Sequence, residues 1–356
     1  MCGIAGFWTT RAAGRDNAVS VARSMAARLA HRGPDSSGVW ADDHGAVAIG
    51  HRRLAIVDLS AAGHQPMTSA SGRFELAFNG EIYNHLALRA EIGERRWRGH
   101  SDTETLLAGF EMWGVESTLR KTVGMFAIAL WDRQQRRLSL ARDRAGEKPL
   151  YYGTLAGSLM FASELKAFKA YPGFSAAVDA GAVALLLRHN YIPAPHSIYQ
   201  GVHKLPPATL LHIDDPERLG EPKAYWSLCD AVQRGQREPF EGTDAAATDA
   251  LERRLSEAIA LQRVADVPLG AFLSGGIDSS TIVALMQRQA DVPVRTFTIG
   301  FDEEGYNEAE HAKAVAAHLG TDHTEMYLSG QQALDIVPRL PTLYCEPFSD
   351  SSQIPT

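Results

Sequence analysis

The sequence predicts two domains of different fold class, an α+β domain followed by an α/β domain built on a parallel sheet. Its 356 residues are enough for about two domains. Short β-branched or aromatic segments predominate in the first half, whereas strands and helices alternate in the second. The pattern changes around a polar stretch near residues 233–243. We therefore expect domains at residues 2–210 and 241–356, joined by a linker at residues 211–240.

The first domain is rich in short strands. Strands are expected at residues 3–8, 46–51, 74–78, 126–131 and 137–142, because these segments are β-branched, aromatic or alternating. Helices are expected at residues 19–30, 86–92 and 103–113. Runs of strands interleaved with a few helices indicate an α+β domain rather than a regular βαβ array.

The second domain opens with a helical pattern, because Leu251, Leu255 and Ile259 recur near helical spacing. Strands at residues 267–273 and 294–299 then alternate with helices at residues 278–289 and 307–319. This alternation indicates a parallel α/β sheet. A sheet of only two or three strands would have open edges, so we expect the chain to be the N-terminal portion of a longer protein.

The composition is that of an ordinary globular protein, with 45% hydrophobic and 22% charged residues. A net charge of −7 disfavours a duplex-binding surface, so no nucleic-acid partner is expected. The sequence has no signal segment and no run of ~18 apolar residues, so no membrane partner is expected and the cytoplasm is the default location. Three scattered cysteines fit a reducing compartment.

Cys2 is a candidate nucleophile because of its place in the chain. Removal of an initiator methionine is favoured before a small residue, and it would give Cys2 a free α-amine. Such an amine titrates near pH ~8, so it can accept the proton of the adjacent thiol. A lone cysteine is more often a small buried hydrophobic residue, so this hypothesis needs support from elsewhere in the chain.

Three downstream motifs add that support, although each also has a purely structural interpretation. Residues 31–35, His-Arg-Gly-Pro-Asp, form a polar turn after a helix. The Asn79-Gly80 pair follows a strand, which predicts either a hairpin turn or an oxyanion hole made by the Asn79 amide and the Gly80 N–H. Residues 101–104 fit a capping box that would leave Asp102 free to bind an ammonium group.

Taken together, the motifs resemble the class II glutamine amidotransferase domain, an N-terminal-nucleophile fold with an αββα sandwich. The resemblance rests on six ordered segments: residues 2–6, 31–35, 51–58, 79–84, 101–104 and 142–152. It implies that Cys2 attacks the side-chain amide of glutamine. It also implies that Asn79 and Gly80 stabilise the oxyanion that forms.

The resemblance further assigns the residues that bind the amino-acid end of glutamine. Arg53 would bind the α-carboxylate, helped by the backbone at Ile56 and Val57, because a planar guanidinium matches a carboxylate. Arg52 is the alternative, and the phase of the Arg-Leu-x-Ile-Val segment favours Arg53. The α-ammonium would be held by two carboxylates, those of Glu81 and Asp102.

A second motif, Phe-Leu-Ser-Gly-Gly-Ile-Asp-Ser-Ser at residues 272–280, lies between an expected strand and an expected helix. Glycines and successive N–H groups at a helix N-terminus favour an anion. It fits neither a Walker loop nor a dinucleotide fingerprint, and it resembles the loop of ATP pyrophosphatases. The resemblance implies ATP binding, with Mg²⁺ on Asp278 and adenine near Ile299. The ATP-binding candidates are Leu273, Ser274, Gly275, Gly276, Asp278, Ser279 and Ile299.

A glutaminase domain followed by this loop resembles the glutamine-hydrolysing asparagine synthase family. The resemblance implies glutamine, aspartate and ATP as substrates. Family members are often dimers, so a homodimer is an open expectation. A paralogous amidotransferase that amidates another carboxylate, on a polysaccharide or peptide, is the first alternative. A non-catalytic binding or regulatory protein is the second, although Cys2, Asn79 and Asp102 are all present. Residues 346–352 resemble a stretch beside the acceptor site.

Overall fold

The computed structural model describes all residues except 156, 302–306, 351–352 and 355–356. It divides the chain into two compact units, each described here by itself. The first comprises Met1–Arg234 together with Cys345–Phe348, and the second comprises Gly235–Tyr344 together with Ser349–Thr356. No described helix has the length and apolar character needed to span a membrane.

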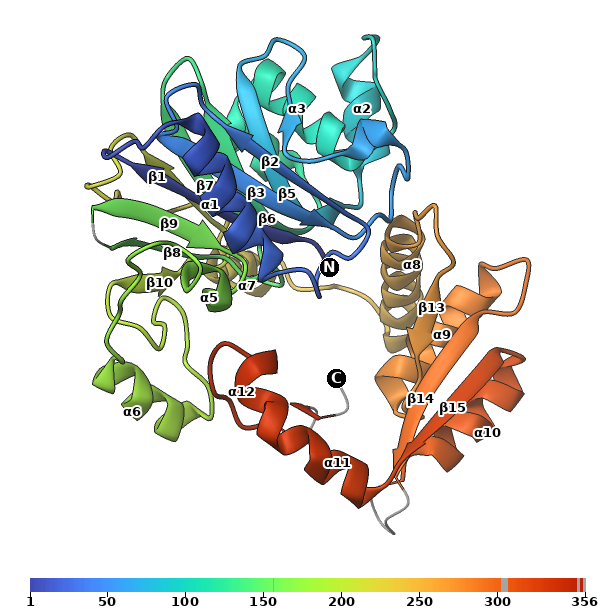
Figure 1. The fold of residues 1–356 in the computed structure, drawn as a ribbon. Helices are drawn as coiled ribbons and strands as arrows, with labels where there is room; N and C mark the ends of the chain where they lie inside the picture. The colour runs from blue at the N-terminus through green and yellow to red at the C-terminus, as the bar shows by residue number, and fades with distance from the viewer. Residues whose placement is uncertain (156, 302–306, 351–352, 355–356) are drawn as a thin grey trace. The chain divides into compact units, whose positions relative to one another are not determined.

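The first unit contains two six-stranded antiparallel sheets (Figure 1). In the first sheet the order is β10-β8-β9-β1-β3-β2. Its strands are β1 (Gly3–Thr9), β2 (Ser36–Ala41), β3 (Val47–Arg53), β8 (Tyr151–Leu155), β9 (Ser158–Ala162) and β10 (Val202–Lys204). Strand β1 pairs with β3 on one side and with β9 on the other, so the chain that follows Cys2 runs through the interior of this sheet.

In the second sheet the order is β12-β11-β7-β6-β5-β4. Its strands are β4 (Met67–Thr68), β5 (Phe74–Ile82), β6 (Gly124–Asp132), β7 (Arg137–Arg142), β11 (Thr209–Ile213) and β12 (Lys223–Ala224). The long pair formed by β5 and β6 runs in register from Phe74 opposite Asp132 to Ile82 opposite Gly124. Leu211 and Ile213 of β11 are fully buried, so this part of the segment expected as a linker belongs to the core of the first unit.

Helices cover the outer faces of the two sheets. Helix α1 (Arg15–Ala27) contributes Ala18, Ala22 and Met25 to a buried cluster with β1 and β9. Helices α2 (His85–Ile92) and α3 (Asp102–Trp113) pack through Leu88 and Phe110 on β5, β6 and β7. A third cluster lies between the sheets, where Trp8 meets Trp131 edge to face. The resulting αββα layers confirm the predicted sandwich.

Four further helices lie wholly or partly in this unit. They are α4 (Val115–Lys121), α5 (Leu165–Phe168), α6 (Ala180–His189) and α7 (Leu228–Arg237). The segment Cys345–Phe348 also packs here, because Glu346 accepts hydrogen bonds from the Tyr151 hydroxyl at 2.9 Å and from the Ile198 amide at 2.7 Å. Glu346, predicted to lie beside an acceptor site, is thus bonded to the first unit, whereas residues 351–352 of the same stretch lie outside the described residues.

The second unit contains a three-stranded parallel sheet of order β13-β14-β15, in agreement with the predicted parallel sheet. Its strands are β13 (Gly270–Phe272), β14 (Arg295–Phe301) and β15 (Asp322–Leu328). Its helices are α8 (Asp244–Gln262), α9 (Ile277–Arg288), α10 (Ala309–Leu319), α11 (Gly330–Ile336) and α12 (Leu340–Leu343). Ile259 of α8 packs with Leu285 and Met286 of α9, while Val283 of α9 packs with Ala312 of α10.

Candidate functional site

The predicted nucleophile lies in a pocket of the first unit. The Cys2 sulfur is partly buried and lies 3.4 Å from the Leu54 amide and 3.6 Å from the Leu54 carbonyl oxygen. Arg32 Nε donates to the Cys2 carbonyl at 2.9 Å, which fixes the backbone of the predicted nucleophile. Burial raises the pKa of the Cys2 thiol, so this sulfur needs a nearby base to become a thiolate near pH 7.

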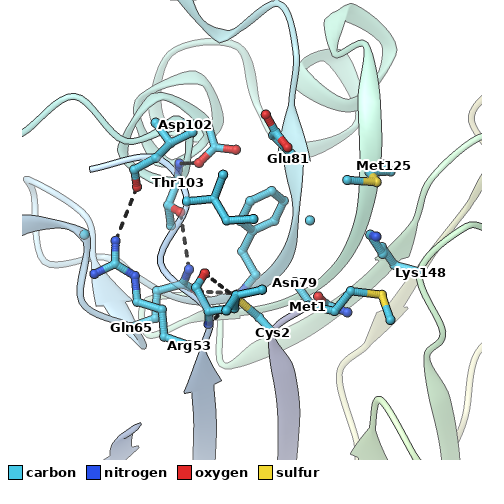
Figure 2. Close-up of a pocket in the computed structure, with 16 residues that line it drawn as sticks. Met1, Cys2, Arg53, Gln65, Asn79, Glu81, Asp102, Thr103, Met125 and Lys148 are labelled. Atoms are coloured by element: carbon cyan, nitrogen blue, oxygen red, sulfur yellow. Dashed lines mark hydrogen bonds between the residues drawn. The ribbon is translucent and has the colours of Figure 1, made fainter. Parts of the chain in front are cut away.

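The α-amine at the chain terminus is the base nearest in the sequence. In the structure this amine belongs to Met1, which lines the pocket beside Cys2 (Figure 2). Burial lowers the pKa of this amine, and the cations of Arg32 and Lys148 lower it further. A lowered pKa favours the neutral amine, which is the form that accepts a proton. The pocket thus disfavours the charged form of a terminal amine, and the amine predicted to act as the base is that of Cys2 once Met1 is removed.

The predicted oxyanion-hole residues lie inside strand β5. Asn79 is 1% exposed, it lines the pocket, and its Nδ2 has no hydrogen-bond partner among the described residues. Such an orphaned donor is costly unless a ligand satisfies it. The sequence also allowed a hairpin turn here, and that interpretation is wrong. Strand β5 continues to Ile82 because β6 pairs with it along its whole length.

Gly80 lies next to Asn79 in the same strand and also lines the pocket. A Cβ at this position would lie 2.1 Å from the Met125 carbonyl oxygen of β6. The close approach of the two strands thus requires glycine at this position. Asn79 and Gly80 line the same pocket as Cys2, so the predicted side-chain and backbone donors lie at one site.

Arg53, rather than Arg52, lies at the pocket. Its guanidinium donates to the carbonyl oxygens of Ser60 at 3.2 Å and Val57 at 3.3 Å, and to that of Asp58. Gly63 leaves room for it, since a Cβ there would lie 2.1 Å from Arg53 Nη2. Arg52 instead donates to the Gly33 carbonyl at 3.1 Å. The backbone therefore holds the Arg53 fork in one orientation at the pocket wall.

Two acidic side chains from different elements meet the same pocket. Asp102 begins helix α3 and is 6% exposed, while Glu81 lies near the end of β5. Burial raises the pKa of Asp102 to about 6, and burial together with the charge of Asp102 raises that of Glu81 to about 7. Two carboxyl groups whose anions are disfavoured without a ligand provide a site for a cation.

The structure thus brings together residues from four separate segments of the sequence. All eight candidates for glutamine chemistry line this pocket: Cys2, Arg53, Ile56, Val57, Asn79, Gly80, Glu81 and Asp102. Sequence reasoning missed other lining residues, among them Gln65, Thr103, Met125 and Lys148. Lys148 lies in one of the quoted motifs, which could have identified it, whereas no sequence signal singles out Gln65. In Figure 2, Asp102, Thr103 and Gln65 lie on one side of the pocket and Met125 and Lys148 on the other.

Another network lies behind the nucleophile. Glu164 accepts from Arg32 Nη1 at 2.9 Å and from Lys166 at 2.9 Å, and it also contacts His31 Nε2 at 3.0 Å. Residues 31–35 therefore do more than turn the chain, because Arg32 links Glu164 to the Cys2 backbone. The sequence placed this motif near the site but did not indicate Glu164, which lies 132 residues away from Arg32.

The predicted ATP-binding residues lie in the second unit, between β13 and α9. Gly275 has φ +78°, and a Cβ there would lie 2.7 Å from His311 Cβ, so only glycine fits without strain. The Ser279 hydroxyl accepts from the Ser274 amide at 3.2 Å and lies 3.0 Å from the Ser274 hydroxyl. Leu273 is buried, and its amide donates to the Phe297 carbonyl at 2.9 Å. These contacts fix the loop at the N-terminus of α9.

Two further candidates lie beside this loop. Asp278 is exposed in the first turn of α9, and Ile299 is partly buried in β14, opposite Met326 of β15. The strands are parallel, so Ile299 lies toward the same edge of the sheet as the loop after β13. The described residues contain no group of three or more His, Cys, Asp or Glu side chains that could hold a metal ion.

Comparisons with known proteins agree with both halves of this description. Residues 1–226 match the glutamine amidotransferase domain family, and residues 250–356 match the asparagine synthase family. Among solved structures, a glutamine phosphoribosylpyrophosphate amidotransferase from B. subtilis matches with a TM-score of 0.50. It is 15% identical, and the match covers 93% of this chain and 91% of that one. At this identity the likeness concerns the fold alone.

Sequence relatives extend over the whole chain. The "Putative asparagine synthetase [glutamine-hydrolyzing]" of Mycobacterium tuberculosis (strain ATCC 25618 / H37Rv) is 36% identical, over 100% of this chain and 56% of the relative. "Asparagine synthetase [glutamine-hydrolyzing] 1" of Bacillus subtilis (strain 168) is 30% identical, over 100% and 54%. "Amidase chry2" of Gibberella zeae is 32% identical, over 90% and 50%. The chain spans about half the length of these relatives.

The fold, the pocket around Cys2 and these matches lead to one conclusion. The chain belongs to the asparagine synthetase-type glutamine amidotransferase family, with an N-terminal-nucleophile amidotransferase domain followed by an asparagine synthase domain.

Proposed function

We propose that the first unit hydrolyses glutamine at Cys2 and supplies the ammonia to an ATP-dependent synthetase reaction. One observation carries the proposal. Around Cys2, the pocket gathers an unpaired amide donor (Asn79), a guanidinium fork (Arg53) and two acids (Asp102 and Glu81). Each group complements one part of glutamine: the developing oxyanion, the α-carboxylate and the α-ammonium.

The proposed chemistry starts once Met1 is removed. The free amine of Cys2 takes the thiol proton, and the sulfur attacks the side-chain carbonyl carbon of glutamine. The oxygen becomes an oxyanion that Asn79 Nδ2 and the Gly80 N–H stabilise. The tetrahedral adduct collapses, the C–N bond breaks, and the proton held by the amine leaves with ammonia. Water then attacks the thioester and yields glutamate and the free thiol.

For the second unit we propose the synthetase half-reactions of a carbon–nitrogen ligase. The β-carboxylate of aspartate attacks the α-phosphate of ATP, which forms β-aspartyl-AMP and releases pyrophosphate. Ammonia then displaces AMP and yields asparagine. The loop of Ser274, Gly275 and Ser279 supports phosphate binding, because its backbone and hydroxyl groups lie at the N-terminus of a 12-residue helix. Ile299 is the residue proposed to lie against adenine.

Mg²⁺ fits this site only as a companion of ATP. A Mg²⁺ ion keeps several waters and uses one or two carboxylates plus substrate phosphates. Asp278 supplies one exposed carboxylate at the helix start, and the described residues contain no larger acidic cluster. Asp278 would therefore hold the ion of a bound Mg·ATP complex, where the metal offsets charge on the phosphate oxygens.

The cysteines of the chain provide a direct test with a matched control. Cys2→Ala should abolish ammonia release from glutamine, whereas Cys229→Ala, at an exposed position of α7, should leave the rate within about twofold of the wild type. Mass spectrometry should show that Met1 is absent from the active protein. Glutaminase activity that survives in Cys2→Ala would contradict the proposal.

A second candidate differs only in the carboxylate that is amidated. It is favoured by the relatives named "Amidase chry2" and "Amidase chyE", which are 32% and 33% identical to this chain. The two candidates are separated by adding a panel of carboxylic acids to the full-length protein with ATP and following pyrophosphate. Stimulation by aspartate supports asparagine synthesis, and stimulation by another acid supports the second candidate.

A further inference from the structure

The backbone of Phe78, the residue before Asn79, is held by side chains from two other elements. Gln65 Oε1 accepts a hydrogen bond from the Phe78 amide at 2.7 Å. His51 Nε2 lies 3.0 Å from the Phe78 carbonyl oxygen, to which it can only donate. Burial lowers the pKa of His51 to about 3, so this ring is neutral. Both polar groups of the Phe78 backbone are therefore bonded to buried side chains.

The position of Gln65 follows from the pairing of β4 with β5. Met67 is opposite Leu76 and Thr68 is opposite Glu75, so the same register would place Gln65 opposite Phe78. The intervening Pro66 has no N–H to donate, and β4 begins only after it. The side-chain oxygen of Gln65 thus serves as the acceptor at the position where the strand pairing has ended.

The other end of the Gln65 amide reaches the acidic side of the pocket. Its Nε2 donates to Thr103 Oγ1 at 3.3 Å, and the Thr103 amide donates to Asp102 Oδ1 at 2.8 Å. Asp102 Oδ2 in turn accepts from the Ile82 amide at 2.9 Å. This path starts at Phe78 and returns to Ile82 of the same strand. The residues between these two anchor points include Asn79, Gly80 and Glu81, the residues proposed to act on glutamine.

The side chains of this path are buried, so water has little access to replace them. Gln65 is 4% exposed, Thr103 3% and Asp102 6%. Only a primary amide of this length offers one acceptor to Phe78 and one donor to Thr103. A glutamate would lose the donor, and a leucine of similar volume would lose both groups. Figure 2 shows Gln65, Thr103 and Asp102 together along one side of the pocket.

From this geometry we propose that Gln65 is a positioning residue for glutamine hydrolysis, which fixes the oxyanion-hole segment of β5 relative to the ammonium-binding end of α3. The proposal rests on the proposed glutaminase function of Cys2. It goes beyond that function by assigning a role to a side chain that neither attacks the substrate nor donates to the oxyanion. Gln65 acts through Phe78 on Asn79 and Gly80, and through Thr103 on Asp102.

The effect of losing Gln65 should fall on the chemical step. Removing an oxyanion-hole donor costs ~10²–10³ in kcat, and a displacement of about 1 Å can cost ~10². Gln65→Leu should therefore lower kcat about 100-fold and change the KM for glutamine by less than about threefold. Gln65→Glu keeps the acceptor for Phe78 and should lose less than Gln65→Leu.

Two substitutions of Thr103 test the same path, one that keeps the hydroxyl group and one that removes it. Thr103→Ser keeps the hydroxyl that accepts from Gln65, so it should keep kcat within about twofold. Thr103→Val has a similar shape without the hydroxyl and should lose about tenfold. A buried amide with only a packing role would instead predict equal effects of the two variants. A thermal unfolding curve for each Gln65 and Thr103 variant checks that the variant is folded before its kcat is compared with that of the wild type.

A transition-state readout completes the test. The γ-aldehyde analogue of glutamine forms a hemithioacetal with a cysteine thiol, and its oxygen occupies the position of the oxyanion. Across the Gln65 and Thr103 variants, its inhibition constant should rise in parallel with the loss in kcat. An unchanged inhibition constant, or a change confined to KM, would overturn the proposal. Ammonia release by Cys2→Ala would instead contradict the proposed glutaminase function. That outcome is distinct from the outcomes that contradict the role of Gln65.

Discussion

Asp102 Oδ2 accepts a hydrogen bond from the backbone amide of Ile82 at 2.9 Å, which ties the start of α3 to the end of β5. This contact places a buried carboxylate beside the strand that carries Asn79 and Glu81. Asp102 has no cationic hydrogen-bond partner among the described contacts, which fits the proposal that a substrate ammonium group is its counter-ion.

Substitution of Asp102 should therefore weaken glutamine binding more than it slows the reaction. Hydrogen bonds to charged groups are worth about 1.5–3 kcal/mol, which corresponds to roughly 10- to 150-fold. For Asp102→Asn we expect the KM for glutamine to rise within this range, with kcat reduced by less than about tenfold. Glu116→Gln, at an exposed position of α4, is the charge-matched control and should change neither constant. A KM within twofold of wild type in Asp102→Asn would refute the assigned role.

Glutamine affinity should depend on pH between about 5 and 8. The pKa of Asp102 is raised to about 6 and that of Glu81 to about 7, so both acids lose their charge as the pH falls through this range. The substrate ammonium stays protonated throughout. Calorimetric titration of Cys2→Ala with glutamine separates this effect from titration of the thiol. The dissociation constant should increase as the pH is lowered from 8 to 5, and a flat profile would contradict the prediction.

Glu81 should also oppose folding when it is ionised. Its folded pKa of about 7 lies above its ordinary value, mainly because of burial. The folded state therefore binds a proton that the unfolded state has released between pH ~4.5 and ~7, and stability falls as the pH rises through that interval. Glu81→Gln should raise the melting temperature at pH 8 and leave it nearly unchanged at pH 4.5. Differential scanning calorimetry of both proteins at the two pH values tests this prediction. A melting temperature raised at pH 4.5 but not at pH 8 would contradict it.

The phosphate loop offers a pair of glycines for comparison. Gly275 has φ +78° and would place a Cβ 2.7 Å from His311 Cβ, whereas at Gly276, whose φ is −72°, a Cβ would be nearest to the Ser274 hydroxyl at 3.3 Å. Strain at the first position is of order 1–3 kcal/mol. Gly275→Ala should weaken ATP binding by at least fivefold in a filter or fluorescence assay on the full-length protein. Gly276→Ala should have a smaller effect, and equal losses would mean that backbone strain is not the cause.

The sequence predicted which segments form the site better than it predicted the tertiary contacts between them. Five expected strands of the first domain correspond to β1, β3, β5, β6 and β7, because each segment is β-branched, aromatic or alternating. The Asn-Gly pair at residues 79–80 suggested an end to β5, yet the strand continues to Ile82. Local turn propensity was overridden there by pairing with β6, a contact that depends on residues about 45 positions away.

Other parts of the site depend on contacts that local patterns cannot show. The hydrogen bond from Phe78 to Gln65 exists because the pairing of β4 with β5 does not extend back past Pro66, and the ion pair between Arg32 and Glu164 joins residues 132 positions apart. Helix α1 begins at Arg15, four residues before the expected start, because Gly14 at φ +90° turns the chain into the helix. Ser101 caps α3 as expected, but the Glu104 carboxylate bonds to the amides of Arg98 and Gly99 rather than to that of Ser101.

The interior position of β1 in its sheet determines what residues added before Cys2 would do to the protein. The strand is bonded on both edges from its first residues, so the polypeptide cannot slide to accommodate additional residues at its beginning. A start codon shifted upstream, or an affinity tag fused in front, would turn the α-amine of Cys2, the proposed base, into an ordinary amide while leaving both sheets intact. Such a product should fold and purify normally but lack the amine that we propose as the base for glutamine hydrolysis.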